Sequence, residues 1–215
     1  MAEIDTIQGG PFDSNIYLVR VGHTAVLIDA GTGFYNQGVL RDIRAILGED
    51  NLDGILLTHE HIDHSGGARG VREEFGCDVF ASSETSEIMG RADRDLTGCS
   101  LFGVDLEPLE DIKKLGGNFQ KGDLNLEIKR APGHAIGQVC FIETEGKALF
   151  PGDLLFCDGG VGRWDLPGGE FIKHRESIKR SLDWDVSSLH PGHGRSEWDD
   201  PKRQMKLAYS MVRDL

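Results

Sequence analysis

The chain has 215 residues, 39% of them hydrophobic, and a formal net charge of −13 at pH 7. This length and apolar content suit a single globular domain with a sizeable core, and without a run of roughly eighteen apolar residues no segment is expected to span a membrane. The acidic surface repels phosphate backbones, so the composition disfavours nucleic-acid partners.

The first residues, MAEIDTIQGG, lack the basic start and apolar stretch of a signal peptide, so a cytoplasmic location is expected. The four cysteines are widely spaced and form no CxxC pair. They therefore indicate neither a disulfide framework nor a thiolate zinc site.

Short β-rich runs alternate with helical segments through the first half of the chain. Gly22 and His23 separate the first two runs and predict a hairpin turn. Apolar residues at helical spacing before Gly48 predict the first helix. The expected strands cover 15–21, 24–31, 54–58 and 77–82, and the expected helices cover 39–47 and 68–75. This alternation predicts an α/β layered fold.

The second half of the chain repeats this style. Its expected strands cover 124–131, 137–144, 147–153 and 186–189, and its expected helices cover 170–182 and the segment after Pro201. A glycine-rich loop, CDGGVGRWDLPGG, follows the third strand. The similar halves suggest two related sheet layers, without a recognisable repeat.

Metal-capable side chains follow apolar strands at four places. The first is the cluster THEHIDH, which contains His59, His61, Asp63 and His64. The other three places each follow a Pro-Gly pair and carry one such residue: His134, Asp153 and His193. Loops at strand ends are where a rigid sheet presents functional groups. The shared design predicts one site assembled from all four places.

Imidazole and carboxylate ligands suit zinc, iron or manganese. In an extended or turn backbone two histidines that are two residues apart can point onto the same metal, so the first ion would be held by His59, His61 and His134. The second ion would be held by Asp63, His64 and His193, with Asp153 bridging the two. Two metals roughly 3.5–4 Å apart can share a hydroxide whose pKa is about 7.

The pattern His59-x-His61-x-Asp63-His64, followed by single residues at 134, 153 and 193, resembles the metallo-β-lactamase superfamily. The resemblance covers nearly the whole chain, from the NIYLV and LIDAG strands to the final PGHG. It implies an α/β fold, a four-layered αββα sandwich of two mixed β-sheets with the metals at one edge between them. It also implies the division of ligands given above.

Two branches of the superfamily differ from this pattern. The main class of β-lactamases places a cysteine where Asp153 stands, and flavodiiron proteins place a glutamate where His61 stands. The loop GVGRWDLPGGEF, residues 160–171, is similar to a loop of short glyoxalase II-like (hydroxyacylglutathione hydrolase-like) hydrolases. That similarity implies cleavage of a thioester such as an acyl-glutathione. We expect one domain, 1–215, without the helical C-terminal domain by which full-length glyoxalase II grips glutathione.

The predicted function is a metal-dependent thioester hydrolase with a small-molecule substrate, no membrane partner and two divalent ions. Zinc is the expected metal, and iron or manganese are alternatives. Metal-bound hydroxide would attack the carbonyl, and Asp63 would hold or accept the proton of this nucleophile. Three alternatives use the same scaffold: a lactonase, a persulfide dioxygenase with one iron on His59, His134 and Asp153, and a nuclease or phosphodiesterase, which the acidic surface disfavours.

Three side chains near the cluster have two interpretations each. Asp29 either orients a metal-bound histidine or begins a turn. Glu60 is expected to face away from the metals, as a solvated or supporting acid. Arg163 either receives a substrate carboxylate or pairs with Asp165.

The remaining histidines are expected outside the metal set. His23 lies in a predicted turn and His174 in a predicted surface helix, so both should be exposed. His190 either supports the site or packs at its strand end.

Overall fold

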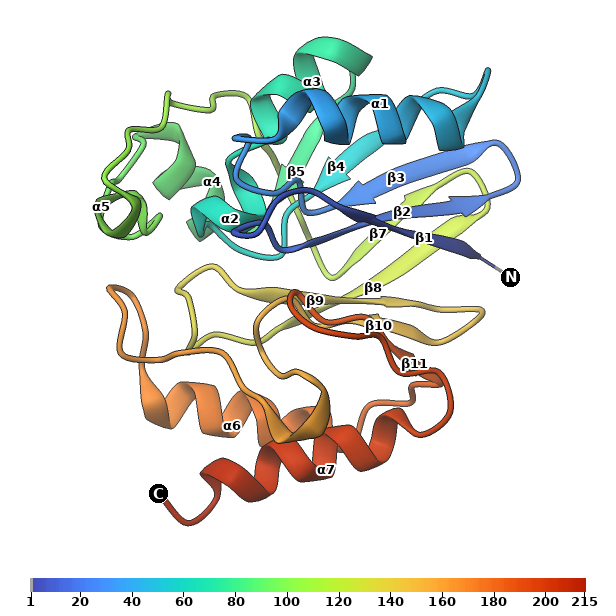
Figure 1. Ribbon diagram of the computed structural model, residues 1–215. Coiled ribbons are helices and arrows are strands. Elements are labelled where there is room, and N and C mark those ends of the chain that lie inside the picture. The colour runs from blue at the N-terminus through green and yellow to red at the C-terminus, as the bar shows by residue number, and fades with distance from the viewer. Residues whose placement is uncertain (1) are drawn as a thin grey trace.

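The computed structural model describes residues 2–215, which form two facing β-sheets with helices on the outer side of each (Figure 1). The first sheet has the strand order β1-β2-β3-β4-β5-β6, antiparallel from β1 to β3 and parallel from β3 to β6. Its strands are β1 Glu3–Gln8, β2 Asn15–Val21, β3 Thr24–Ile28, β4 Gly54–Leu56, β5 Val79–Ala81 and β6 Lys113–Lys114. The helices of this half are α1 Asn36–Leu47, α2 Ile62–Ser65, α3 Ala68–Phe75, α4 Ser83–Gly90 and α5 Cys99–Phe102.

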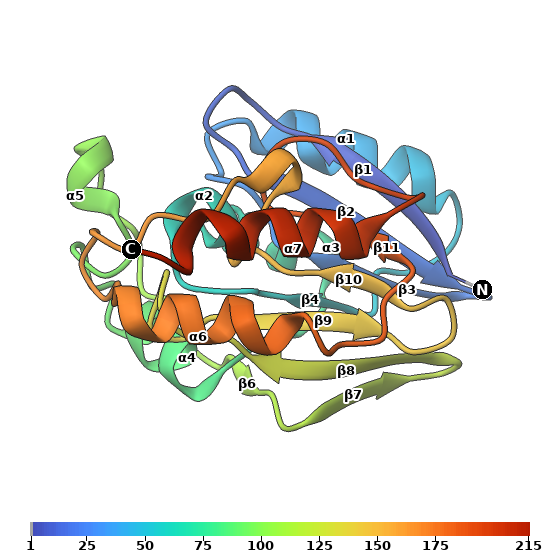
Figure 2. The ribbon, with the colours of Figure 1, turned by 90° about the horizontal axis from the view of Figure 1, so that it is seen from below.

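The second sheet has the order β11-β10-β9-β8-β7, with β10 and β11 parallel and the other neighbours antiparallel. Its strands are β7 Asn118–Lys121, β8 Leu124–Arg130, β9 Val139–Glu143, β10 Ala148–Phe150 and β11 Ser188–Leu189. Two helices, α6 Phe171–Ser181 and α7 Pro201–Val212, lie side by side beneath this sheet (Figure 2). The helix–sheet–sheet–helix order confirms the expected αββα sandwich.

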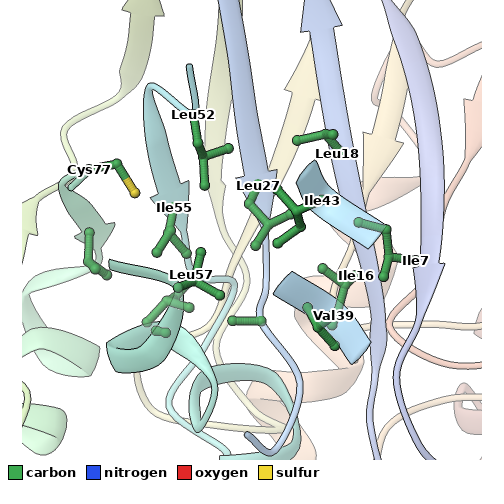
Figure 3. Close-up of a cluster of buried hydrophobic side chains, with 14 of the residues drawn as sticks. Ile7, Ile16, Leu18, Leu27, Val39, Ile43, Leu52, Ile55, Leu57 and Cys77 are labelled. Atoms are coloured by element: carbon green, nitrogen blue, oxygen red, sulfur yellow. The ribbon is translucent and has the colours of Figure 1, made fainter. Parts of the chain in front are cut away.

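Both faces of the central strands are buried, which explains the continuous apolar runs of the sequence. Successive side chains of a strand point to opposite faces. In β2, Ile16 and Leu18 therefore join the core beneath α1, whereas Tyr17 and Val19 join the core between the sheets. Figure 3 shows the first of these cores, where Ile43 of α1 packs among the strand side chains.

Helix α1 covers the first sheet with Val39, Ile43 and Leu47, which recur every four residues. It ends at Leu47 and is followed by Gly48, whose φ of 61° suits a residue without a Cβ. The helix begins at Asn36, three residues before the expected start at 39. The prediction missed this first turn because the turn is polar and shows no apolar periodicity. Within residues 2–215, no helix is long and apolar enough to cross a membrane.

Two of the expected strands run too long at ends that carry candidate site residues. The strand expected over 24–31 ends at Ile28 because Asp29 has a left-handed backbone, with a φ of 60°. The strand expected over 147–153 ends at Phe150 because Gly152, with a φ of 53°, turns the chain. Most of the elements that we did not expect are short or lie at sheet edges, and the longer helix α4 was missed as well: β1, α2, α4, α5, β6, β7 and the 3₁₀ turn Cys157–Gly159.

Candidate metal centre

The histidine cluster occupies the loop after β4 and the first turn of α2, and backbone hydrogen bonds fix this segment to its neighbours. The Ala30 N–H donates to the His64 carbonyl (2.7 Å), and the Ile62 N–H donates to the Thr97 carbonyl (2.8 Å). His61 caps α2 with an extended backbone, so Asp63 and His64 stand on the first turn of that helix. The loop therefore presents its ligand candidates from a fixed backbone.

Glycines allow the loops that carry Asp153 and His193 to approach this cluster closely. A Cβ on Gly152 would lie 2.8 Å from the Thr58 side chain. A Cβ on Gly192 would lie 2.2 Å from Asp153 Oδ1 and 2.6 Å from His64 Cε1. The Pro-Gly pairs are therefore needed for close approach of the backbones as well as for turning.

His59, His61 and His134 form a buried group in which one ring nitrogen of each lies within 4.8 Å of the others. His61 Nδ1 and His134 Nε2 are 2.9 Å apart. The Nδ1–H of His134 donates to the carbonyl of Arg163 (2.6 Å), which leaves the lone pair of Nε2 facing the group. This is the arrangement that three imidazole ligands of one metal require.

Asp63, His64 and His193 form a second, less buried group. Asp63 Oδ2 lies 3.1 Å from His193 Nε2 and 3.7 Å from His64 Nε2. Asp153 lies between the two groups: its Oδ1 is 3.2 Å from His64 Nε2, and its Oδ2 is 3.6 Å from the Nε2 atoms of His134 and His193. All seven side chains named from the sequence are thus in one cluster.

Three buried atoms of this cluster fit a metal. Among the described residues, His59 Nε2, His64 Nε2 and Asp153 Oδ1 have no hydrogen-bond partner. Leaving buried polar atoms unsatisfied costs about 1–3 kcal/mol each, so native proteins rarely do so. A cation coordinated by these atoms would remove that cost, and the imidazole and carboxylate donors suit zinc, iron or manganese.

The charges of the cluster favour a cation as well. Burial and the neighbouring histidines lower the pKa of His59 far below its usual value, and burial and His134 lower that of His61 to about 3. Both rings are therefore neutral at pH 7 and offer lone pairs. Burial acts against a charged His64, but surrounding carboxylates outweigh it and raise the pKa of this ring: Asp153, Asp29 and Asp63. The same carboxylates would attract a divalent ion.

Asp29 holds two residues of the cluster through its carboxylate, as the first interpretation expects, and it adopts a left-handed backbone directly after β3. The Nδ1–H of His64 donates to Asp29 Oδ2 (2.7 Å), which leaves His64 Nε2 for a metal. The Thr58 N–H donates to Asp29 Oδ1 (2.8 Å), and the Thr58 hydroxyl donates to Oδ2 (2.7 Å). The left-handed backbone of Asp29 directs its carboxylate into this position.

Glu60 faces away from the ligand groups, as expected, and of its two interpretations the supporting acid is correct and the solvated one is not, because the residue is 1% exposed. Its Oε1 accepts the Ile136 N–H (2.9 Å) and the Gly137 N–H (3.2 Å), and its Oε2 accepts the Thr85 hydroxyl (2.8 Å). Glu60 therefore ties the cluster to the loop that carries His134. Its partners on that loop are backbone groups, which have no signature in the sequence.

The expectation that His174 lies on the surface is wrong, because the ring is fully buried. His174 lies on the face of α6 that packs toward the second sheet. The centroid of the His174 ring is 6.2 Å from that of Trp164. Burial lowers the pKa of His174 to about 4. His23 is exposed, as expected. His190 packs at its strand end, stacked on Phe150 with ring centroids 5.1 Å apart.

Arg163 pairs with Asp165 through two bonds: Nε to Oδ1 (2.9 Å) and Nη2 to Oδ2 (2.7 Å). Arg163 also lines a pocket of about 290 Å³ over the metal cluster. Five of the predicted ligands form one side of this pocket: His61, Asp63, His134, Asp153 and His193. Apolar side chains form much of the rest: Leu101, Phe102, Phe156, Val161 and Leu166.

Known proteins are similar to this chain in sequence and in fold. The sequence model of the metallo-β-lactamase superfamily matches residues 9–193. A probable metallo-hydrolase of Methanocaldococcus jannaschii is 34% identical over 194 residues, which cover 87% of this chain and 91% of the relative. The hydroxyacylglutathione hydrolase GloC of Haemophilus influenzae is 36% identical over 134 residues, 61% of this chain and 63% of the relative. Among solved structures, TTHA1623 in a di-iron-bound form is 30% identical, with a TM-score of 0.79 over 98% of this chain and 100% of that one.

The chain belongs to the metallo-β-lactamase superfamily. Within the superfamily, which uses divalent metals, it is a metallo-hydrolase.

Proposed function

We propose that this chain hydrolyses acyl thioesters of small thiols at a centre of two divalent metal ions, with acyl-glutathione among the substrates. The observation that carries the proposal is the cluster of seven His and Asp side chains beneath a pocket of about 290 Å³. That volume is close to the lower end of small-molecule pockets, about 300 Å³. The similarity to GloC supports the thioester class.

The proposed ligands of the first ion are His59, His61 and His134, and those of the second are Asp63, His64 and His193, with Asp153 between the ions. Zinc is the metal that we propose, and the di-iron form of TTHA1623 makes iron the alternative to test. When bound, two such ions supply a hydroxide nucleophile at neutral pH and a Lewis acid for the carbonyl oxygen.

Asp63 is the proposed catalytic residue. Burial acts to raise the pKa of its carboxyl, but His64 and His193 outweigh burial and keep this pKa below its usual value. The group is therefore a carboxylate at neutral pH and can accept a proton or a hydrogen bond at Oδ2. It lines the pocket, so it can reach a nucleophile there.

A thioester suits this arrangement because its leaving group needs little help. A thiol has a pKa of about 8.5, so a thiolate leaves near neutral pH without a strong general acid. For the thiol part we propose Arg163 as a contact, since a substrate carboxylate in the pocket can replace Asp165 in the bidentate pair.

Elemental analysis of the purified protein, combined with assays of acyl-glutathione, other thioesters and lactones, tests the proposal. We expect two metal ions per chain and thioester cleavage, and we expect His61→Ala and Asp153→Ala to lose both metal and activity. The matched control is His23→Ala, which removes an exposed histidine. Full activity in either ligand variant, or a preference for lactones, would refute the proposal. One iron per chain with oxygen uptake on a persulfide would replace it with a dioxygenase.

A further inference from the structure

The pocket beside the candidate ligands is lined by apolar side chains as well as by the ligands themselves. Helix α5 stands at one end of the molecule, on the same side as the loop of residues 160–168 (Figure 1). Leu101 and Phe102 of α5 line the pocket together with Leu166 of that loop. A substrate that reaches the metals therefore passes between apolar side chains.

This apolar surface continues outside the pocket. Phe12 and Phe34 contact the ring of Phe102 edge to face, with ring centroids 6.1 and 6.4 Å away. Their exposed fractions are 59% and 49%, and that of Leu101 is 63%. Exposing so many large apolar side chains together costs solvation free energy, and such patches mark binding sites. The continuity with the metal pocket indicates that the ligand of this patch is the substrate.

Helix α5 is fixed in place even though its tip is exposed. Cys99 is fully buried at its start, and the Thr97 hydroxyl donates to Cys99 Sγ (3.1 Å). The Thr97 carbonyl in turn accepts the N–H of Ile62, the first residue of the helix that carries Asp63. The apolar side chains are therefore held at a set distance from the proposed catalytic carboxylate.

We infer that the substrate has an apolar acyl group, aliphatic or aromatic, and that Leu101, Phe102 and Leu166 form the surface that binds it. This inference rests on the proposed thioester hydrolysis, in which water adds across the C–S bond to give a carboxylic acid and a thiol. The acyl group is the part that suits an apolar wall, because the sulfur leaves as a thiolate and burying that charge without a partner is costly. The thiol part therefore extends toward solvent.

The charges of the pocket agree with this orientation. Among the residues that the structure describes in the pocket lining, Arg163 is the one with a permanent positive charge, and Asp165 already neutralises it. The side chains of Leu101, Phe102 and Leu166 carry no charge, so an acyl group with its own carboxylate would lose hydration against them without gaining a partner. An uncharged apolar acyl group meets no such cost.

The test is a series of acetyl, butyryl, hexanoyl and octanoyl thioesters of one thiol, assayed with the metal-loaded protein. We expect kcat/KM to rise by up to about fourfold for each added methylene until the pocket is full. We expect Leu101→Ser and Phe102→Ser to flatten this rise, because the lost activity is greatest for the longest chains. Leu207→Ser, which removes a leucine from the exposed side of α7, should keep the wild-type rise.

Two outcomes overturn the inference while leaving thioester hydrolysis intact. One is equal kcat/KM across the series, and the other is that kcat/KM rises with chain length in Leu101→Ser and Phe102→Ser as it does in the wild type. If the metal-loaded protein cleaves no thioester, the proposed function itself fails. Calorimetry gives a readout that is independent of turnover, since octanoate should bind the wild type more tightly than acetate, and Leu101→Ser should reduce that difference. Equal binding of the two acids would refute the apolar wall directly.

Discussion

The two halves of the molecule contribute to the same cluster of candidate ligands in different ways. The N-terminal half supplies four candidate ligands within six consecutive residues, two in the loop after β4 and two in the first turn of α2. The C-terminal half supplies three, each from its own loop and each after a Pro-Gly pair. The first arrangement depends on local backbone geometry, whereas the second depends on how closely two sheets approach. The halves should therefore fail in different ways when they are altered.

The largest expected effect comes from forcing the C-terminal loops away from the cluster without touching a ligand. In Gly192→Ala the new Cβ would lie 2.2 Å from Asp153 Oδ1, so the loop or the carboxylate must shift. Since a misplacement of about 1 Å can cost roughly 100-fold in rate, we expect kcat/KM to fall by about that factor, with a loss of bound metal. Steady-state kinetics and elemental analysis measure both.

The matched control for this variant is Gly117→Ala. A Cβ at Gly117 meets open space, and its backbone is not left-handed. We expect wild-type activity from the control. Wild-type activity and metal content in Gly192→Ala would show that the C-terminal loops tolerate displacement, and the contrast between the halves would be lost.

The next effect concerns Glu60, the buried carboxylate that connects the N-terminal ligand segment to the loop carrying His134. Glu60→Gln replaces an acceptor of three hydrogen bonds by an amide with one acceptor oxygen and an added donor. Hydrogen bonds to charged groups contribute about 1.5–3 kcal/mol, and at about 2–4 °C per kcal/mol for a chain of this size we expect Tm to fall by roughly 3–12 °C. Calorimetry measures the change in the metal-loaded protein.

The control is Glu87→Gln on the exposed side of α4, where the side chain is 65% exposed. A surface substitution of this kind should leave Tm nearly unchanged. We also expect Glu60→Gln, but not the control, to release metal faster to a chelator, because the loop that carries His134 is loosened. Identical release rates would mean that Glu60 stabilises the fold without positioning that ligand.

The sequence predicted the N-terminal loop better than its surroundings for physical reasons. The cluster THEHIDH is contiguous, so its chemistry is visible without any knowledge of the fold. The buried strands were visible because both faces are apolar, but their ends were not, since the turns depend on single residues such as Asp29 and Gly152. Helices α2 and α5 have four residues each, which is too short for a periodic pattern.

Supporting residues were harder to predict than the ligand candidates. The buried position of Glu60 depends on backbone N–H groups at 136 and 137, and any residue type supplies those. The burial of His174 depends on which face of α6 meets the second sheet. Such features arise from packing between segments that are distant in the chain, so no local pattern records them.

A smaller effect, on the pH dependence of stability, is expected at the contact between the two halves, where His190 packs edge to face against Tyr17 of β2. Burial lowers the pKa of His190 to about 4. In the unfolded chain a histidine has a pKa of about 6.5, so between these values the unfolded state binds more protons. The contribution of His190 to the free energy of unfolding is therefore fully present above pH 6.5 and is lost as the pH falls toward 4. The loss from this one residue is about 2 kcal/mol at pH 5.

His190→Gln should remove this contribution to the pH dependence. Glutamine can retain a donor and an acceptor for the hydroxyls of Ser188 and Ser196, which bond to the two ring nitrogens in the wild type. Urea unfolding at pH 7 and pH 5 measures the difference in the free energy of unfolding. His23→Gln, at the exposed turn, is the control. An unchanged difference in His190→Gln would mean that other groups cause the acid sensitivity.

The smallest effect tests whether the C-terminal half also recognises the thiol part of the substrate. Asp165→Asn removes the negative partner of Arg163 and leaves the guanidinium free at the pocket. Because exposed ion pairs are weak, we expect KM for acyl-glutathione to fall by only about two- to threefold, and less at high salt.

The comparison that decides the role of Arg163 is a thioester of an uncharged thiol with the same acyl group. Its KM should not change in Asp165→Asn, and Arg163→Ala should raise KM for acyl-glutathione alone. If both variants alter the two substrates equally, the loop affects the acyl wall or the metals rather than a substrate carboxylate. If neither variant alters either substrate, Arg163 serves the site only through its carbonyl, which accepts the Nδ1–H of His134.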